Sequence, residues 1–231
     1  MRNPNQEEEK LAVARKALEF IQDGMVVGLG SGSTSIKFIE LLGELVQRGL
    51  RIRGIASSAR SAELARSLSI PLTDFHETSE IDVAVDGADE VDEKLALIKG
   101  GGGALLREKI VASAARQFIV IIDSSKLVKH LGRFPLPVEV IPMAAPLVDR
   151  KLREMNIHPT IRKLPDGAEY KTDEGNLIID CACGEILHAA ELAASIRALI
   201  GVVEHGLFLN MAERVIAAKG SEVSMIVRQG R

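Results

Sequence analysis

The chain has 231 residues, of which 46% are hydrophobic and 26% charged, and its formal net charge is −3. This composition is typical of a globular protein with a full hydrophobic core, and it excludes a disordered chain. The balanced charge lacks the basic patch of a nucleic-acid-binding protein, and six Phe, one Tyr and no Trp are too few for base stacking. We therefore expect no nucleic-acid partner.

The sequence contains no candidate membrane or secretion segment. No run approaches the roughly 18 apolar residues of a membrane helix. Residues 1–10 carry three consecutive glutamates and no apolar signal core. Cys181 and Cys183 lie one residue apart, too close for an ordinary disulfide, so we expect two reduced, structural thiols. These features predict a cytoplasmic protein without a membrane partner.

The first 130 residues alternate short apolar strands with amphipathic helices. In chain order we expect a helix at 11–21, a strand at 25–29, a helix from 34 to about 47, a strand at 51–56, a helix at 59–68, a strand at 81–85, a helix at 104–115 and a strand at 118–122. This alternation predicts an α/β fold with a mainly parallel, Rossmann-like sheet flanked by helices. Ligands of such sheets bind at the carboxyl ends of the strands.

The pattern changes after Gly132. The prolines of 134–137 and 141–142 indicate a connection, because proline disfavours helix in the residue before it. A helix at 146–155, strands at 160–164 and 176–181 and a helix at 186–199 then predict a small α+β domain. We assign 132–204 to this inserted domain and 1–131 with 205–231 to the α/β domain, whose sheet the strands 206–217 and 222–227 would rejoin.

The glycine-rich loop Gly28–Ser35 lies between a predicted strand and a predicted helix. Glycine lets the backbone approach a ligand, and the start of a helix offers free N–H groups to a phosphate. The loop lacks the third glycine of a dinucleotide fingerprint, where Ser33 stands, and the lysine of a Walker loop. It therefore suits a small phosphate monoester. The alternative is a tight turn capped by Ser33.

The acidic stretch Asp86–Glu90 follows the strand at 81–85. Two carboxylates three residues apart, Asp86 and Asp89, could bind sugar hydroxyls or act in acid–base chemistry. None of the five histidines lies in these loops, so no metal site is predicted. The alternative is a solvated acidic turn.

Lys99 and four consecutive glycines precede the helix that contains Glu108. A glycine run costs backbone entropy and adds no packing, which favours a role in presenting N–H groups to a negatively charged oxygen. Lys99 adds a full charge there. Glu108 lies about one turn into the helix and could point back over the loop, or it could be an exposed helix carboxylate. Lys126 and Lys10 could each be ordinary surface lysines.

Together these loops describe a site for a small phosphorylated sugar. Aldose–ketose isomerisation needs a base beside the carbonyl, a cationic or N–H-rich pocket for the enediolate oxygen, and polar groups that hold hydroxyls. It requires neither a nicotinamide nor a metal, so no cofactor is expected.

The sequence resembles a known family, the type A ribose-5-phosphate isomerases, over residues 10 to 228. The motifs that carry the resemblance are Gly28–Thr34, Asp86–Glu90, Ile98–Gly102, Arg107–Ile110, Asp123–Lys126 and Gly132–Val140. The resemblance implies interconversion of ribose 5-phosphate and ribulose 5-phosphate in the non-oxidative pentose phosphate pathway. It also implies a homodimer or homotetramer.

The resemblance also implies a role for each matched residue. Glu108 would be the base, and Lys99 with the amides of Gly100, Gly101 and Gly102 would stabilise the enediolate. Asp86 and Asp89, with Gly87 and Ala88 between them, would bind hydroxyls and assist ring opening. The phosphate would be held by Ser31, Gly32, Ser33 and Thr34, helped by Lys126 and Lys10.

Two other functions remain as alternatives. A related sugar-phosphate deaminase should carry a different base, often an essential histidine, which these loops lack. A non-catalytic sugar-phosphate sensor would be expected to carry a DNA-binding helix-turn-helix, yet only about ten residues precede the first predicted helix.

Overall fold

The computed structural model describes residues 4–228, which divide into two compact units. The first unit contains residues 4–88, 107–127 and 210–228, and the second contains 89–106 and 128–209. Residues 1–3 and 229–231 of the predicted α/β domain lie outside this described part. The sequence analysis placed residues 89–106 in the α/β domain, whereas the structure groups them with the smaller unit. The reason is packing, since their two short strands pair within that unit.

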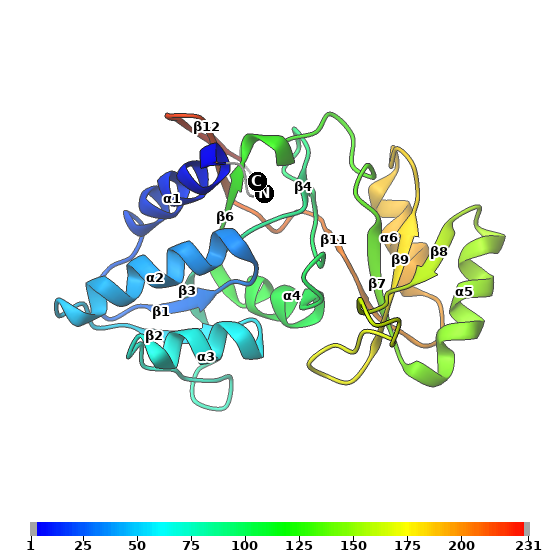
Figure 1. The fold of residues 1–231 in the computed structure, drawn as a ribbon, viewed down its shortest axis with the longest axis horizontal. Coiled ribbons are helices and arrows are strands. Elements are labelled where there is room, and N and C mark those ends of the chain that lie inside the picture. The colour runs from blue at the N-terminus through cyan, green and yellow to red at the C-terminus, as the bar shows by residue number, and fades with distance from the viewer. Residues whose placement is uncertain (1–3, 229–231) are drawn as a thin grey trace. The chain divides into compact units, whose positions relative to one another are not determined.

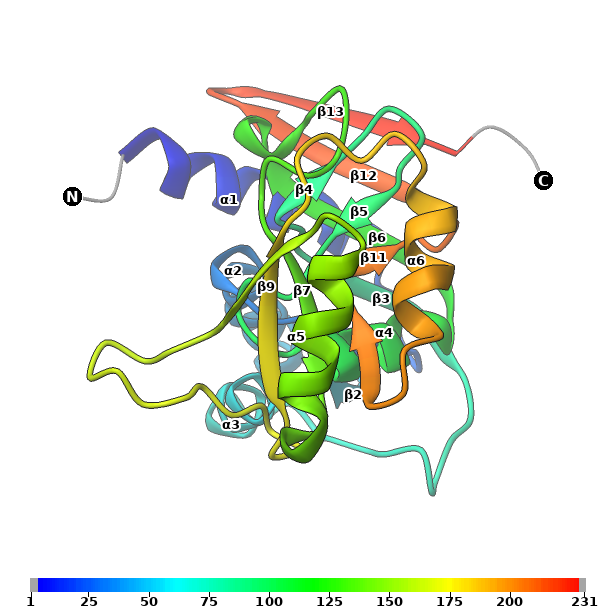
Figure 2. The same ribbon diagram turned by 90° about the vertical axis from the view of Figure 1, so that its right-hand side faces the viewer.

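The first unit is built on a six-stranded sheet in the order β13-β12-β6-β3-β1-β2 (Figure 1). Its strands are β1 (Val26–Leu29), β2 (Arg53–Ala56), β3 (Ile81–Asp86), β6 (Ala115–Asp123), β12 (Arg214–Lys219) and β13 (Glu222–Val227). All neighbours are parallel except the hairpin of β12 and β13, which Figure 2 shows at one edge. The sequence prediction of an α/β fold with a mainly parallel sheet is confirmed.

Helices cover both faces of this sheet. They are α1 (Pro4–Leu18), α2 (Ser33–Gln47), α3 (Ala59–Ser67) and α4 (Leu105–Ser113). Alternate strand residues such as Val27 and Leu29 face the core that α1, α2 and α3 complete. On the other face, a Cβ on Gly28 would lie 2.7 Å from Val111 of α4, so glycine at this position permits the close packing of that helix.

The second unit contains a four-stranded antiparallel sheet and a three-stranded one. The four-stranded sheet has the order β10-β7-β9-β8, with β7 (Leu136–Val140), β8 (His158–Ile161), β9 (Leu177–Ala182) and β10 (Val202–His205). The three-stranded sheet has the order β11-β5-β4, with β4 (Glu90–Val91), β5 (Leu97–Ile98) and β11 (Leu207–Phe208). Helices α5 (Ala145–Glu154) and α6 (Ala189–Arg197) contribute to the core of this unit; in Figure 2, α5 lies in front of β7 and α6 lies to its right. Short 3-10 helices occupy Ser124–Lys126 in the first unit and Pro142–Ala144 in the second.

Two sequence expectations about this part of the chain were wrong. The proline-rich stretch 134–137 was expected to be a connection, yet Leu136 and Pro137 begin the fully buried strand β7. Proline fits there because its fixed φ is compatible with extended backbone, and its carbonyl accepts a hydrogen bond from Gly206 N at 2.7 Å.

The single strand expected at 206–217 is two strands in different sheets, and Asn210 between them has a left-handed φ of 57°.

Glu139 is a buried carboxyl in the middle of β7. Its Oε1 accepts hydrogen bonds from Thr172 Oγ1 and Asn176 Nδ2, both at 2.9 Å. Burial nevertheless raises the pKa of Glu139, and the negative charges of Glu174 and Glu204 add to this effect. The ionised form is therefore less stable in the folded protein than in the unfolded chain.

We predict that Glu139→Gln becomes progressively more stable than the wild type as the pH rises from about 4 to about 7. A carboxyl whose pKa is raised by folding makes the protein lose stability as the pH rises through that pKa, and glutamine does not titrate. Urea unfolding midpoints at several pH values measure the difference. Glu191→Gln, whose side chain is 83% exposed, is the control and should show little trend. A constant gap between Glu139→Gln and wild type would contradict the prediction.

Candidate active site

The loop between β1 and α2 presents the start of a helix without a side-chain cap. Gly32 is the N-cap residue, with a φ of 92° that favours glycine, and it makes no side-chain capping hydrogen bond. Ser33 is already the first residue of α2, so the alternative of a turn capped by Ser33 is wrong. The first N–H groups of an uncapped helix, here those of Ser33 and Thr34, suit an anion.

Asp86, at the end of β3, holds this loop in place. It is 4% exposed, and its Oδ1 accepts hydrogen bonds from Ser31 N at 2.8 Å, Ser35 Oγ at 2.9 Å and Gly87 N at 2.7 Å. A Cβ on Gly30 would lie 2.2 Å from the same oxygen, so only glycine fits there. For Asp86, the alternative of a solvated acidic turn is therefore wrong.

A cluster of serines supports the same loop, and sequence reasoning missed it. Ser31 Oγ lies 2.9 Å from Ser57 Oγ, and Ser61 Oγ donates to the carbonyl of Gly30 at 2.7 Å. Ser58 caps α3 by accepting from Ser61 N at 3.1 Å. The signal in the sequence was the pair Ser57–Ser58 directly after β2, the strand next to β1.

The predicted base and two predicted lysines also belong to the first unit. Glu108, in the first turn of α4, is 6% exposed, so the alternative of an exposed helix carboxylate is wrong. Lys126 ends the 3-10 helix after β6 and is half-buried. Lys10 is held on its own helix by an ion pair with Glu7 at 2.9 Å.

In the second unit, Lys99 is a buried lysine directly after β5. It is 2% exposed, its N–H donates to the carbonyl of Gly206 at 2.9 Å, and its Nζ lies 5.5 Å from the centroid of the Phe208 ring. Burying an ammonium group is costly unless neighbours compensate for the lost water. A cation retained at such a position is a candidate for electrostatic catalysis.

The segment Lys99–Gly103, which we call the Lys-Gly loop, is tied to Asp89. Gly101 N donates to Asp89 Oδ2 at 2.7 Å, and a Cβ on Gly101 would lie 2.6 Å from Asp89 Oδ1. Gly102 differs, because a Cβ there would meet no atom within 4 Å and its φ is not left-handed. Neither packing nor backbone conformation explains the glycine at 102, whereas a ligand lying against the loop would explain it.

Glu90, the last residue of the acidic stretch, has a structural role. It is fully buried, and its two oxygens accept hydrogen bonds from Gly132 N and Phe134 N, each at 2.7 Å. The carboxylates of this stretch therefore have different roles. Asp86 binds the β1–α2 loop, Asp89 binds the Lys-Gly loop, and Glu90 binds the backbone of residues 132–134. Two further residues that the sequence did not single out, Arg162 and Tyr170, contact the Lys-Gly loop.

The cysteines do not contribute a nucleophile. Both are free thiols; burial raises the pKa of Cys183 to about 11 and that of Cys181 still further. They remain protonated at neutral pH. Over residues 4–228, three or more His, Cys, Asp or Glu side chains nowhere form a group that could hold a metal ion. Among the same residues no helix is long and apolar enough to cross a membrane.

Comparison with known proteins identifies the family. Residues 53–222 match the family model described as Ribose 5-phosphate isomerase A (phosphoriboisomerase A). A ribose-5-phosphate isomerase A from Parvibaculum lavamentivorans is 48% identical over 95% of this chain and 98% of its own length. The chain belongs to the ribose 5-phosphate isomerase A family. The resemblance seen in the sequence is thereby confirmed.

Solved structures of the family agree with the fold. Ribose 5-phosphate isomerase A from Methanocaldococcus jannaschii is 43% identical, with a TM-score of 0.91 over 96% of this chain and 99% of its own. A D-ribose-5-phosphate isomerase in complex with phospho-erythronic acid is 40% identical, with a TM-score of 0.94 over 96% and 99% of the two chains.

We predict that Gly102→Ala lowers isomerase activity at least 10-fold while the melting temperature stays within a few degrees of that of the wild type. The added methyl group meets no protein atom, and alanine reduces the freedom of the unfolded chain. The methyl group would, however, occupy the space we assign to the ligand. Steady-state kinetics and thermal unfolding measure the two effects. Gly30→Ala is the contrasting control and should destabilise the protein by about 1–3 kcal/mol. Full activity of Gly102→Ala would remove the ligand explanation.

Proposed function

We propose that the chain interconverts D-ribose 5-phosphate and D-ribulose 5-phosphate through an enediolate, as a step of the non-oxidative pentose phosphate pathway. The observation that carries this proposal is the buried carboxylate of Glu108 in the first turn of α4, the helix that follows the Lys-Gly loop. The family membership of the chain supports the same reaction.

In the proposed mechanism, Glu108 moves the proton between two carbon atoms. Its carboxylate removes the proton from C2 of the open-chain aldose, and the electrons of that C–H bond form the C1=C2 double bond of the enediolate. The same group then delivers the proton to C1. Transfer of the O2 proton to O1 completes the ketose, so the product is an isomer of the substrate and no electrons are gained or lost. A positioned general base of this kind contributes about 10²–10⁴-fold.

Lys99 and the amides of Gly100 and Gly102 would stabilise the negative charge on the enediolate, whereas the Gly101 amide already donates to Asp89. This charge exists only during the reaction, so donors fixed in advance lower the barrier more than they strengthen substrate binding. Asp86 and Asp89 would bind hydroxyls and assist ring opening and the transfer between O1 and O2. Asp86 has the second task of fixing the phosphate loop.

We assign the phosphate to Ser31–Thr34 at the start of α2, with Lys126 and Lys10 adding positive charge. An uncapped helix start with several hydroxyls suits a phosphate monoester. The similar isomerase solved with phospho-erythronic acid supports the ligand class, because this acid carries both a phosphate and a carboxylate that resembles an enediolate.

We further propose a cytoplasmic homodimer or homotetramer that acts on a small sugar phosphate without a cofactor. A sugar-phosphate sensor is less well supported, because a binding domain has no need for both a buried lysine and a buried carboxylate. A deaminase would call for a different base from Glu108.

We predict that the purified protein converts ribose 5-phosphate to ribulose 5-phosphate in the presence of a chelator, and that Glu108→Gln lowers kcat by about 10²–10⁴-fold. Glutamine keeps the shape of glutamate but cannot accept the proton. A coupled or direct ketose assay measures both rates, with the exposed Glu191→Gln as the control. If the wild type forms no ketose, the proposed function is wrong; if Glu108→Gln keeps the wild-type rate, Glu108 is not the base.

We predict that Lys126→Ala raises KM for ribose 5-phosphate about 10-fold with a smaller change in kcat. Removing a charge that binds the unreacting phosphate weakens ground state and transition state alike. The matched control is Lys129→Ala, an exposed lysine three residues further along. An unchanged KM for Lys126→Ala would exclude Lys126 from the phosphate site.

A further inference from the structure

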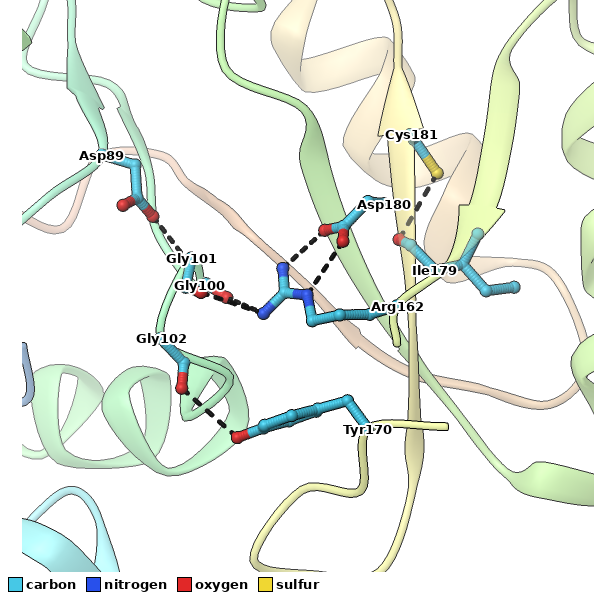
Figure 3. Close-up of polar contacts among 9 residues, drawn as sticks. All are labelled: Asp89, Gly100, Gly101, Gly102, Arg162, Tyr170, Ile179, Asp180 and Cys181. Atoms are coloured by element: carbon cyan, nitrogen blue, oxygen red, sulfur yellow. Dashed lines mark hydrogen bonds and ion pairs between the residues drawn. The ribbon is translucent and has the colours of Figure 1, made fainter. Parts of the chain in front are cut away.

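Arg162, which follows β8, links the Lys-Gly loop to the four-stranded sheet of the second unit (Figure 3). Its Nη1 donates to the carbonyl oxygens of Gly100 at 2.9 Å and Gly101 at 3.1 Å. Its Nε donates to Asp180 Oδ2 at 2.8 Å, and its Nη2 donates to the other oxygen of that carboxylate. The Arg162 side chain is 14% exposed, so solvent screens this fork-shaped pair less than it would an open surface pair.

These contacts fix the direction of the amides in the loop. A peptide group is planar, and its C=O and N–H point in opposite directions. Holding the Gly100 carbonyl turns the N–H of Gly101 away from Arg162, and that N–H meets Asp89 Oδ2 at 2.7 Å. Holding the Gly101 carbonyl likewise turns the N–H of Gly102 away from Arg162.

The rest of the loop is closed by weaker contacts. Gly103 N donates to the carbonyl of Gly100 at 2.9 Å, and Tyr170 Oη donates to the carbonyl of Gly102 at 3.3 Å. Within residues 4–228, the N–H groups of Lys99, Gly101 and Gly103 thus have acceptors, whereas those of Gly100 and Gly102 donate to no other described residue. Gly102 is also the position with open space around it. A Cβ on Gly100 would instead lie 2.8 Å from Leu105, so of these two amides that of Gly102 is the more open to a ligand.

Four consecutive glycines have no side chains that could hold the loop in one conformation. Their backbone freedom is large, and a donor that must reorganise during the reaction stabilises the enediolate less than a fixed one. Arg162 is the charged side chain that contacts two successive carbonyls of this run, and Asp180 fixes its guanidinium. Lysine could not replace it fully, because an ammonium group lacks the planar fork that reaches the carboxylate and both carbonyls.

We propose that Arg162, held by Asp180, is a positioning residue for the isomerase reaction that aims the Gly102 amide at the enediolate oxygen. This inference rests on the proposed function of the Lys-Gly loop. Arg162 acts through the loop and does not itself touch the substrate. Its contribution therefore belongs to the transition state, and it should affect kcat rather than KM.

The test compares Arg162→Ala and Arg162→Lys with the wild type in steady-state kinetics. We expect Arg162→Ala to lower kcat by about 10- to 100-fold, because a small misplacement of a catalytic group has an effect of this size. KM should stay within about threefold. Guanidinium ion at millimolar concentration should restore part of the kcat of Arg162→Ala, and Arg162→Lys should retain an intermediate kcat.

The matched control is Arg153→Ala. Arg153 also forms a two-point pair with an aspartate, Asp149, and donates to a backbone carbonyl, that of Pro159 at 3.1 Å, but it does not contact the loop. Arg153→Ala should have the kcat of the wild type, and added guanidinium ion should not change that kcat. If Arg162→Ala does not fold, Asp180→Asn replaces it and should lower kcat by a smaller factor with KM preserved.

Three results would overturn the inference. The first is a kcat of Arg162→Ala within twofold of that of the wild type, and the second is a rise in the KM of Arg162→Ala without a change in its kcat. The third is a loss of activity in Arg162→Ala that matches its loss of folded protein and that also occurs in Arg153→Ala. An inactive wild type would instead refute the proposed function. An active wild type with an inactive Glu108→Gln and an unaffected Arg162→Ala would refute the role of Arg162 alone.

Discussion

Hydrogen bonds between charged side chains and glycine-rich backbone determine which amides of the two anion loops remain available. In the first unit, one oxygen of Asp86 accepts from Ser31 N and Gly87 N and thereby fixes the β1–α2 loop. In the second unit, Arg162 holds two carbonyls of the Lys-Gly loop while Asp89 accepts from Gly101 N. Glycine permits these conformations but does not select one. The charged partners make that selection, so the shape of each loop depends on a few electrostatic contacts.

Burial of ionisable side chains is the second feature of the molecule. Asp86, Lys99 and Glu108 are 4%, 2% and 6% exposed. Each loses the hydration that stabilises its charge, and neighbouring donors or acceptors must compensate. A core designed for stability alone would use apolar residues at such positions. Their retention at the ends of strands and at the start of a helix agrees with a reaction in which protons move and an oxygen becomes negatively charged.

The sequence was sufficient for the parts of the site that follow from local pattern. Strand periodicity placed Gly28–Ser35 and Asp86 at the carboxyl ends of two strands of a mainly parallel sheet. The structure shows that these strands, β1 and β3, are neighbours. Their contact follows from this observed pairing, which the sequence analysis did not predict. The burial of Glu108 could not be predicted from the sequence. Residue spacing shows which face of a helix a side chain lies on, but it does not show which residues pack against that face.

Other features depend on pairing between distant residues and carry no local signal. Arg162 lies 61 and 62 residues from the glycines that it holds, and nothing in its neighbourhood marks it. The strand β7 was missed because Pro137 within it and the prolines on either side indicate a connection, whereas pairing with β9 and β10 determines its conformation. The division of 206–217 into two strands likewise depends on which sheets the residues join, and the apolar pattern is the same in either case.

We propose that the reaction proceeds by proton transfer through an enediolate with Glu108 as the base. The most direct measurement is nuclear magnetic resonance of ribose 5-phosphate held at equilibrium with the wild-type protein in deuterium oxide. Deuterium should accumulate at C2 of the aldose and C1 of the ketose over many turnovers, and this exchange should be slower with Glu108→Gln in proportion to its lower kcat. Ketose formation without any deuterium uptake, as in a direct hydride shift, would contradict this proposal.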